Sequence, residues 1–170
     1  MSLKLVCISD THNELKTMIE QNIIPDGDVL IHAGDFTMGG SIPEIAAFNE
    51  QIGKLPHKHK LVIAGNHDVM FETDSNLARS ILTNVTYLED SGIEIDGMKF
   101  WGSPWQPKFF NWAFNLPRGL KLAEKWALIP DDTDILITHG PPFMIQDMAP
   151  REGEGVLAFV TENTGCKDLQ

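Results

Sequence analysis

The sequence lacks the features of membrane, secreted and disulfide-linked proteins. Its 170 residues contain no run near the roughly 18 apolar residues that a membrane span requires. Met1 and Ser2 lead directly into the apolar segment 3–8, so there is no room for a signal peptide. The two cysteines, Cys7 and Cys166, form neither a disulfide framework nor a Cys-x-x-Cys pair. We therefore predict a cytoplasmic protein in a reducing compartment, with no membrane partner.

Basic residues are also scarce. Lysine and arginine total 13 against 24 acidic residues, which gives a formal charge of −11. Because basic residues supply most of the affinity for nucleic-acid backbones, this charge argues against nucleic acid as a partner. It does not exclude a small phosphorylated substrate, since a cation-loaded cleft attracts an anion even on an acidic protein. The length and the 42% hydrophobic content predict one domain over residues 1–170.

Short apolar runs alternate with helical patterns along the first 65 residues. The expected elements are a buried strand at 3–8, a helix at 14–22, a strand at 29–32, a helix at 41–52 and a strand at 61–64. Ser41 and Glu44 form a capping box at the start of the second helix, and Cys7 is expected to be a small buried group in the first strand. This alternation predicts an α/β fold with a parallel sheet covered by helices.

Beyond residue 65 the pattern changes to shorter elements. The expected elements are a short helix near 77–82, antiparallel strands at 85–88, 93–95 and 98–101, a helix at 118–128 and a fourth buried strand at 134–138. Asp96-Gly97 is a strong hairpin signal between the last two antiparallel strands. These short strands predict a second sheet that packs on the first.

Half of the aromatic residues lie in the segment 100–114. They are Phe100, Trp101, Trp105, Phe109, Phe110, Trp112 and Phe114. Core packing and the anchoring of a loop explain most of this clustering. The alternative is that one or two of the rings form the wall of a ligand pocket.

Polar residues follow the predicted parallel strands, at the points where these strands end. They are Asp10, His12, Asp35, Asn66, His67, Asp68 and His139. In parallel sheets, ligands bind beyond the carboxyl ends of the strands, so one cleft can hold the whole set. Hydrolysis of a phosphate ester at neutral pH needs a hydroxide equivalent and neutralisation of the phosphoryl charge. Two divalent metals supply both, by acidifying a bridging water and by binding the phosphoryl oxygens.

A two-metal site needs one carboxylate that bridges the ions, and Asp35 is the candidate. Asp10 and His12 are predicted to hold one ion, while Asn66 and His139 hold the other. Mixed nitrogen and oxygen ligands suit manganese, iron, nickel or zinc better than calcium, and manganese is favoured here.

His67 is the candidate catalytic residue. It is expected to protonate the leaving oxygen or to stabilise the phosphate, so that Asn66 and His67 both contact the substrate. Asp68 is predicted to orient His67, with an ordinary surface acid as the alternative. Gly34 and Gly65 remove side-chain bulk where the backbone turns beside the ligands.

Each of these residues alone also has a structural interpretation, as a hydrogen-bonded histidine, a helix cap or a turn residue. Their shared position at strand ends is what favours the metal site. Among the other histidines, His32 is expected to lie beside the site and support it. His57 and His59 belong to the charged connector 56–60, for which a solvated turn is predicted.

Four of these segments resemble the metal-site motifs of the calcineurin-like metallophosphoesterase superfamily. They are Ser9-Asp10-Thr11-His12, His32-Ala33-Gly34-Asp35-Phe36-Thr37, Gly65-Asn66-His67-Asp68 and Thr138-His139-Gly140-Pro141-Pro142. A fifth, Gly102-Ser103-Pro104-Trp105-Gln106-Pro107, resembles the small subgroup with nucleotide phosphodiesterase activity. The resemblance implies a four-layer αββα sandwich with two metals at one end, and ligand and catalytic roles like those assigned above.

One part of the family pattern is missing. Past a Gly-Cys segment like Gly165-Cys166, the family continues to a Gly-His-x-His motif whose two histidines complete both metal sites. The 170 residues contain no such motif, so five of seven expected ligands are present and the C-terminal strand region is expected to be lacking. Natural shortening, an artificial cut and completion by another subunit, as in a homo-oligomer, all remain open.

The resulting hypothesis is a metal-dependent phosphoesterase that acts on mono- or diesters of a small substrate, nucleotides included. The alternative is a catalytically impaired phosphate- or nucleotide-binding relic, because the histidine pair is absent. A nuclease is a third option, which the acidic charge disfavours.

Overall fold

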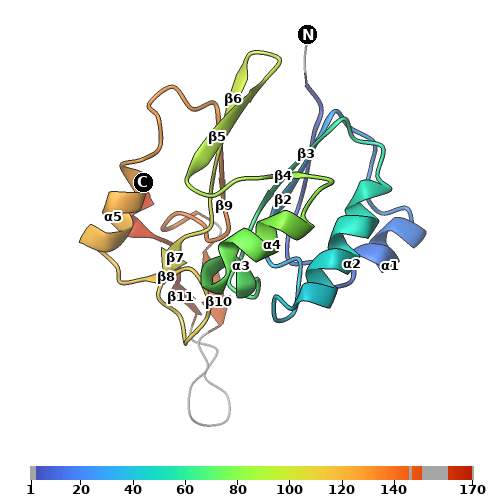
Figure 1. Ribbon diagram of the computed structural model, residues 1–170. Helices are drawn as coiled ribbons and strands as arrows, with labels where there is room; N and C mark the ends of the chain where they lie inside the picture. Colours follow the sequence, from blue (N-terminus) through green and yellow to red (C-terminus); the bar gives the residue numbers. More distant parts are fainter. Residues whose placement is uncertain (1–2, 146, 151–160, 170) are drawn as a thin grey trace.

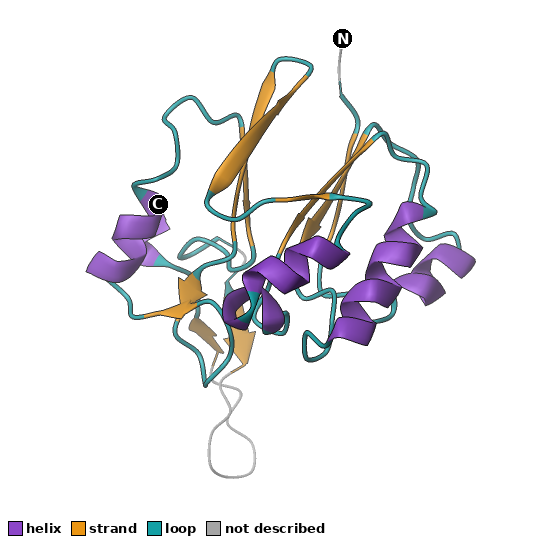
Figure 2. Cartoon of the chain, in the orientation of Figure 1, coloured by secondary structure: helices purple, strands orange, loops and turns teal. Residues whose placement is uncertain are grey.

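The structure is a computed structural model that describes residues 3–145, 147–150 and 161–169. Two β-sheets pack face to face, with helices on the outer side of each (Figure 1). Figure 2 shows the same order of layers, from the N-terminal helices through both sheets to helix α5 (Leu120–Trp126). This mixed α/β architecture agrees with the predicted fold class.

The first sheet is parallel and has the order β1-β2-β3-β4. Its strands are β1 (Leu5–Ile8), β2 (Val29–Ala33), β3 (His59–Ile63) and β4 (Thr86–Tyr87). The helices that follow these strands are α1 (Leu15–Glu20), α2 (Ile42–Gly53), α3 (Met70–Thr73) and α4 (Ser75–Ile81). They lie on one face of the sheet, opposite the second sheet (Figure 1).

Successive side chains of each strand point to opposite faces of the first sheet, and this alternation produces two hydrophobic cores. On β2, Leu30 faces the helices and Ile31 faces the second sheet, and both are buried. Helix α2 packs Ile45, Phe48 and Ile52 on the sheet, and its capping box is present as predicted. Strand β2 is therefore buried on both faces. Because it lies between β1 and β3, the residues that follow it lie between the loops that follow those two strands.

The second sheet has three strands in the order β5-β6-β9. They are β5 (Ser91–Ile95), β6 (Met98–Ser103) and β9 (Ile135–Thr138). The predicted hairpin is confirmed: Asp96 and Gly97 both have positive φ, at 50° and 83°, between antiparallel β5 and β6. The remaining elements are β7 (Gln106–Pro107), β8 (Asn115–Leu116), α5 (Leu120–Trp126), β10 (Met148–Pro150), β11 (Thr161–Asn163) and the 3-10 helix η1 (Lys167–Leu169). In α5, Leu122 and Trp126 face inward as predicted.

Three predictions about the strands are wrong. Cys7 lies in β1 as expected but is exposed, because β1 is the edge of the first sheet. The run around 85–88 forms β4, which pairs in parallel with β3 instead of entering the second sheet. The run at 134–138 forms β9, which pairs with β6 in the second sheet and leaves Leu136 exposed.

The solvated turn predicted for His57 and His59 is also wrong. His57 is buried and its Nε2 is 3.0 Å from the Pro25 carbonyl oxygen, while His59 begins β3 opposite Val29. The strand starts earlier than its apolar run because the register with β2 extends the pairing to residue 59. Among the described residues, no helix has the length and apolar character needed to cross a bilayer.

Candidate metal centre

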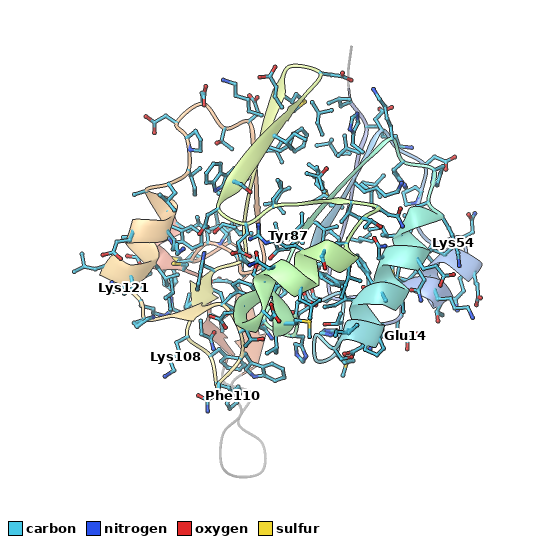
Figure 3. The ribbon with its side chains drawn as sticks, viewed as in Figure 1. Glu14, Lys54, Tyr87, Lys108, Phe110 and Lys121 are labelled. Atoms are coloured by element: carbon cyan, nitrogen blue, oxygen red, sulfur yellow. The ribbon has the colours of Figure 1, made fainter. Side chains whose placement is uncertain are left out.

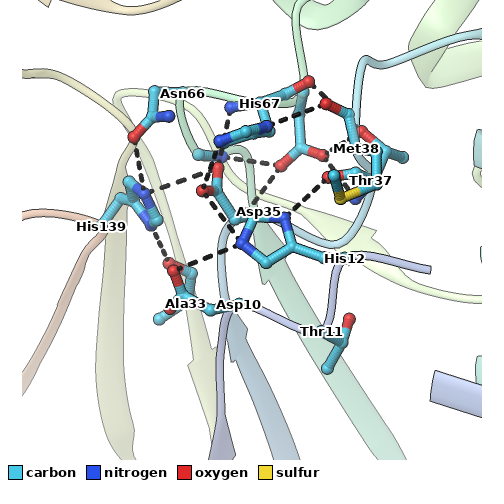
Figure 4. A network of polar contacts seen from close by, with 12 residues as sticks. Asp10, Thr11, His12, Ala33, Asp35, Thr37, Met38, Asn66, His67 and His139 are labelled. Atoms are coloured by element: carbon cyan, nitrogen blue, oxygen red, sulfur yellow. Dashed lines mark hydrogen bonds and ion pairs between the residues drawn. The ribbon is translucent and has the colours of Figure 1, made fainter. Parts of the chain in front are cut away.

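The loops after β1, β2, β3 and β9 meet at one end of the two sheets (Figure 4). They bring together the predicted ligands Asp10, His12, Asp35, Asn66 and His139, with His67 beside them. These residues span nearly the whole chain, and the topology brings them together because each follows a strand that ends at this edge.

The backbone around the ligands is in an unusual conformation. Asp10, His12 and Asp35 have φ values of 52°, 39° and 56°, in the left-handed region that L-residues rarely adopt. The loops hold one another in place: the Asp10 N–H donates to the Gly34 carbonyl, and the His12 N–H donates to the Asp35 carbonyl, both at 3.0 Å. Such strain is characteristic of sites whose geometry serves a function.

The three histidines are all oriented by backbone carbonyl oxygens. The Nδ1 atoms of His12, His67 and His139 lie 3.2, 2.8 and 2.9 Å from the carbonyl oxygens of Thr37, Met38 and Ala33 respectively. A carbonyl oxygen only accepts, so each Nδ1 carries the proton. When the ring is neutral, each Nε2 then has a lone pair directed toward the centre, where it can bind a metal ion or take up a second proton.

Asp35 lies at the centre of the group, 3% exposed. Its Oδ1 accepts the His67 N–H at 2.8 Å and lies 3.5 Å from the Nε2 of His139. Its Oδ2 lies 3.8 Å from the Nε2 of His12 and 4.0 Å from that of His67. Burial raises the pKa of Asp35, but the hydrogen bonds and positive charge of His139 and His67 outweigh it and hold the pKa below its usual value.

The pKa of His139 shifts in the opposite direction to that of Asp35. Burial lowers its pKa, but the neighbouring Asp35 carboxylate outweighs burial and raises the pKa to about 9. The Oδ1 of Asn66 lies 3.2 Å from the same Nε2. Without a metal, a proton on His139 offsets the negative charge of Asp35, and a metal ion would replace that proton.

The donor set fits two divalent ions. The ligand atoms form two groups, and within each group all atoms lie within 4.8 Å of one another. One group is Asp10, Asp35 and His139, and the other is His12, Asp35 and His67. Asp35 belongs to both groups, as a bridging carboxylate must. Asp10 lies with His139 in the first of these groups, and its Oδ1 is also 4.0 Å from the Nε2 of His12, with which it is predicted to hold an ion. Imidazole nitrogens with carboxylate oxygens are the donors that divalent transition metals prefer.

Two glycines leave the space that these ligands occupy. A Cβ on Gly65 would overlap the carboxylate of Asp35, and a Cβ on Gly34 would lie 2.7 Å from Nδ1 of His139. Gly34 also has a φ of 98°. The site therefore requires glycine at both positions, as predicted, because a larger residue would overlap the ligand side chains.

Asp68 is bound differently from the prediction. Its carboxylate, fully buried, accepts four hydrogen bonds: from the N–H groups of Asp35, Thr37 and Gly65 and from the Thr37 hydroxyl, at 2.7 to 3.0 Å. Burial raises its pKa to about 6, although these hydrogen bonds oppose the shift. The Nδ1 of His67 is held by Met38 and not by Asp68. Asp68 joins the loops after β2 and β3, and the surface-acid alternative is wrong as well.

Other residues around the centre were not predicted as parts of it. Thr37, Met38 and Ala33 act through their carbonyl groups, which every residue carries, so their side chains give no signal in the sequence. The ring of Trp112 lies against His67 with centroids 4.0 Å apart, and only the aromatic clustering pointed toward it. His32 is buried beside the site, with its Nε2 2.9 Å from the Thr11 hydroxyl, as the supporting role predicts.

Known proteins resemble this chain over nearly its whole length. The family model for calcineurin-like phosphoesterase matches residues 3–164. The human protein named metallophosphoesterase domain-containing protein 1 is 44% identical over 190 residues, covering 98% of this chain and 57% of the human protein. A UPF0046 protein of Caenorhabditis elegans is 45% identical over 183 residues, covering 98% of this chain and 62% of that protein.

The chain thus spans little more than half the length of these relatives. A solved structure from Aquifex aeolicus, described as a protein of unknown function, is 23% identical with a TM-score of 0.36 over 64% of this chain. The family match and the relatives suffice for the assignment: the chain belongs to the calcineurin-like phosphoesterases.

Proposed function

We propose that the protein is a metal-dependent phosphoesterase that hydrolyses mono- or diesters of a small phosphorylated substrate, with nucleotides as the leading candidates. The observation that supports it is the position of Asp35, whose carboxylate belongs to both groups of ligand atoms. The acidic charge of the chain favours a small substrate over a nucleic acid. The cysteine content favours a cytosolic location.

In this proposal Asp10, His12, Asn66 and His139 would hold two divalent ions from the surrounding loops, and Asp35 would be a ligand shared by both. Manganese is favoured, and iron, nickel or zinc would suit the same donors. When bound, such ions supply an acidified water and neutralise the phosphoryl oxygens. The contribution of the chain is to hold the ligand atoms in place before the substrate arrives, which the carbonyl contacts of the histidines support.

His67 acts as the general acid. Its Nε2 faces the centre while the Met38 carbonyl holds a proton on Nδ1, so in the doubly protonated ring the second proton, on Nε2, can pass to the leaving oxygen of the ester. Asn66 precedes it on the same loop and contacts substrate as well as metal. Asp68 supports both by holding the backbone of Gly65 and Asp35.

The test is hydrolysis of bis-p-nitrophenyl phosphate and p-nitrophenyl phosphate with and without manganese. We expect manganese-stimulated turnover that Asp35→Ala lowers by at least about a thousandfold, since loss of the bridge removes several kcal/mol of charge stabilisation. Asp26→Ala, at an exposed carboxylate in the connection between α1 and β2, is the matched control and is expected to retain activity. Unchanged turnover in Asp35→Ala would contradict the proposal.

A further inference from the structure

Six of the seven aromatic residues in segment 100–114 fall into two groups in the structure. Phe100 and Phe114 are each 1% exposed and belong to the cores, and Trp105 packs on Phe114 while its Nε1 donates to Asp90. Core packing and loop anchoring account for these rings. They do not account for Phe109, Phe110 and Trp112, which lie together on the connection between β7 and β8.

Trp112 belongs to the wall of the metal centre. Its ring lies against that of His67, with centroids 4.0 Å apart and planes inclined by 42°. The next residue attaches the same segment to the ligand loop, because the N–H of Ala113 donates to the carbonyl of Asn66 at 3.1 Å. The aromatic segment is thus bound to the loop that carries both a predicted ligand and the proposed general acid.

Phe109 and Phe110 stay exposed although the segment around them is well ordered by hydrogen bonds. They are 61% and 64% exposed, with ring centroids 4.4 Å apart, and Figure 3 shows Phe110 at the end of the molecule where β7 and β8 lie. The Asn115 side chain fixes their backbone: its Oδ1 accepts from the Phe109 N–H, and its Nδ2 donates to the carbonyls of both residues. Phe110 has a φ of 49°, which is rare for an aromatic residue.

Phe110 is thus held exposed in a strained conformation, two residues before the Trp112 ring that lies against the proposed general acid. Large rings kept exposed in this way indicate a binding role. If His67 protonates the leaving oxygen, the leaving group must lie on the His67 side of the centre, which Trp112 borders. Hydrolysis adds water to phosphorus and breaks the bond to the leaving oxygen, which takes the proton of His67. The released alcohol is therefore the part of the substrate that meets the aromatic segment.

We propose that Trp112, Phe109 and Phe110 form a subsite for a flat aromatic or heteroaromatic ring on the leaving group of the substrate. This inference rests on the proposed function and narrows its substrate class. Aromatic rings pack on one another in offset or edge-to-face arrangements that a saturated ring of similar size does not reproduce. The subsite is therefore expected to prefer benzyl over cyclohexylmethyl esters, whose leaving alcohols are both simple primary alcohols.

The test measures binding first, so that it does not depend on turnover. Calorimetry on the full chain with manganese compares benzylphosphonate with cyclohexylmethylphosphonate, and we expect the benzyl compound to bind roughly three- to tenfold more tightly. The double variant Phe109→Leu and Phe110→Leu keeps apolar bulk and is expected to lose this preference. Leu120→Ala, at a residue of α5 that is 83% exposed, is the control and should keep it.

Trp112 needs a second comparison, because it also touches His67. Trp112→Leu is expected to lose the benzyl preference, and Trp112→Phe is expected to keep most of it. A purely structural Trp112 would weaken both phosphonates equally in both variants. That result, or equal binding of the two phosphonates by the unmodified chain, overturns the proposal.

Failure of this inference is distinguishable from failure of the proposed function. If manganese-dependent hydrolysis of p-nitrophenyl phosphate persists while the two phosphonates bind alike, the aromatic subsite is wrong and the phosphoesterase stands. If neither phosphonate binds at all, the subsite is overturned whatever the turnover. A matching preference in kcat/KM for benzyl methyl phosphate over cyclohexylmethyl methyl phosphate would strengthen it.

Discussion

The metal centre has two unlike sides. On the ligand side, the loops after the strands are joined by backbone hydrogen bonds, and each histidine is fixed by a carbonyl group. On the aromatic side, the segment between β7 and β8 is anchored at its base and exposes Phe109 and Phe110. The ligand side leaves no space for change, whereas the rings have open surroundings. Under the two proposals above, the first side decides whether hydrolysis occurs and the second decides which substrate is used.

The strongest way to break this contrast is Gly65→Ala. A methyl group there would overlap the Asp35 carboxylate and lie 2.8 Å from Cε1 of His139. We expect the unfolding free energy to fall by about 1–3 kcal/mol, because the packed ligand loops must shift. Activity should fall by about a hundredfold or more, since the bridging carboxylate is displaced. Urea denaturation and turnover of p-nitrophenyl phosphate measure these two effects, and a manganese titration shows whether metal affinity falls as well.

Gly97→Ala is the control for backbone strain. Gly97 has a φ of 83° in the β5–β6 hairpin, and nothing lies within 4 Å of a Cβ placed there. This variant is expected to lose about 1–2 kcal/mol of stability with unchanged manganese affinity. Equal manganese affinity in Gly65→Ala and Gly97→Ala would show that the ligand side has more freedom than its contacts imply.

A smaller effect is expected for Asp68→Asn. Each oxygen of the Asp68 carboxylate accepts two hydrogen bonds. In asparagine one of these oxygens becomes an NH2 group, which cannot accept the two hydrogen bonds at that position. We expect a loss of about 1–3 kcal/mol in unfolding free energy and a roughly 10- to 100-fold loss in metal affinity or activity.

Asp147→Asn is the matched control for Asp68. Asp147 is 3% exposed and accepts the backbone N–H groups of Met144 and Gly165 outside the centre. Its variant should lose stability and keep its manganese affinity. If both variants bind manganese as the unmodified chain does, Asp68 holds the fold and not the site.

The same contrast explains how far the sequence predicted the structure. Helix α2 was predictable because Ser41 and Glu44 mark its start and its apolar residues recur at helical spacing. The convergence of Asp10, Asp35 and Asn66 was predictable because the carboxyl ends of parallel strands share one edge. Regular elements and the chemistry at their ends therefore follow from local pattern and topology.

The remaining features depend on contacts that leave no local signal. A short apolar run does not specify its neighbours, so the sequence places β4 in the wrong sheet and does not show that Leu136 of β9 is exposed. The partner of His67 is a backbone carbonyl, and the partners of Asp68 are mostly backbone N–H groups, which all residues possess. The aromatic segment could be recognised, but only its folded position shows which rings are anchors and which remain exposed.

The smallest change in stability is expected for Glu44, which tests whether the ligand side extends as far as α2. Glu44 on α2 accepts hydrogen bonds from Asn13 and from the N–H of Met38, whose carbonyl holds His67. Burial raises the pKa of Glu44, but the hydrogen bonds from Asn13 and Ser41 outweigh it and lower the pKa to about 2. We expect Glu44→Gln to lose about 1 kcal/mol of stability at neutral pH, as for the loss of a helix cap.

The pH dependence of this loss follows from the lowered pKa. Folding favours the ionised form of Glu44, so its contribution is complete above its ordinary pKa of 4.5 and declines as the pH falls toward about 2. The stability difference between Glu44→Gln and the unmodified chain should therefore shrink in urea denaturation between pH 5 and pH 3. A difference that stays constant over this range would mean that the carboxylate charge has no part in it. In that case the charged network ends at the ligand loops and does not extend to α2.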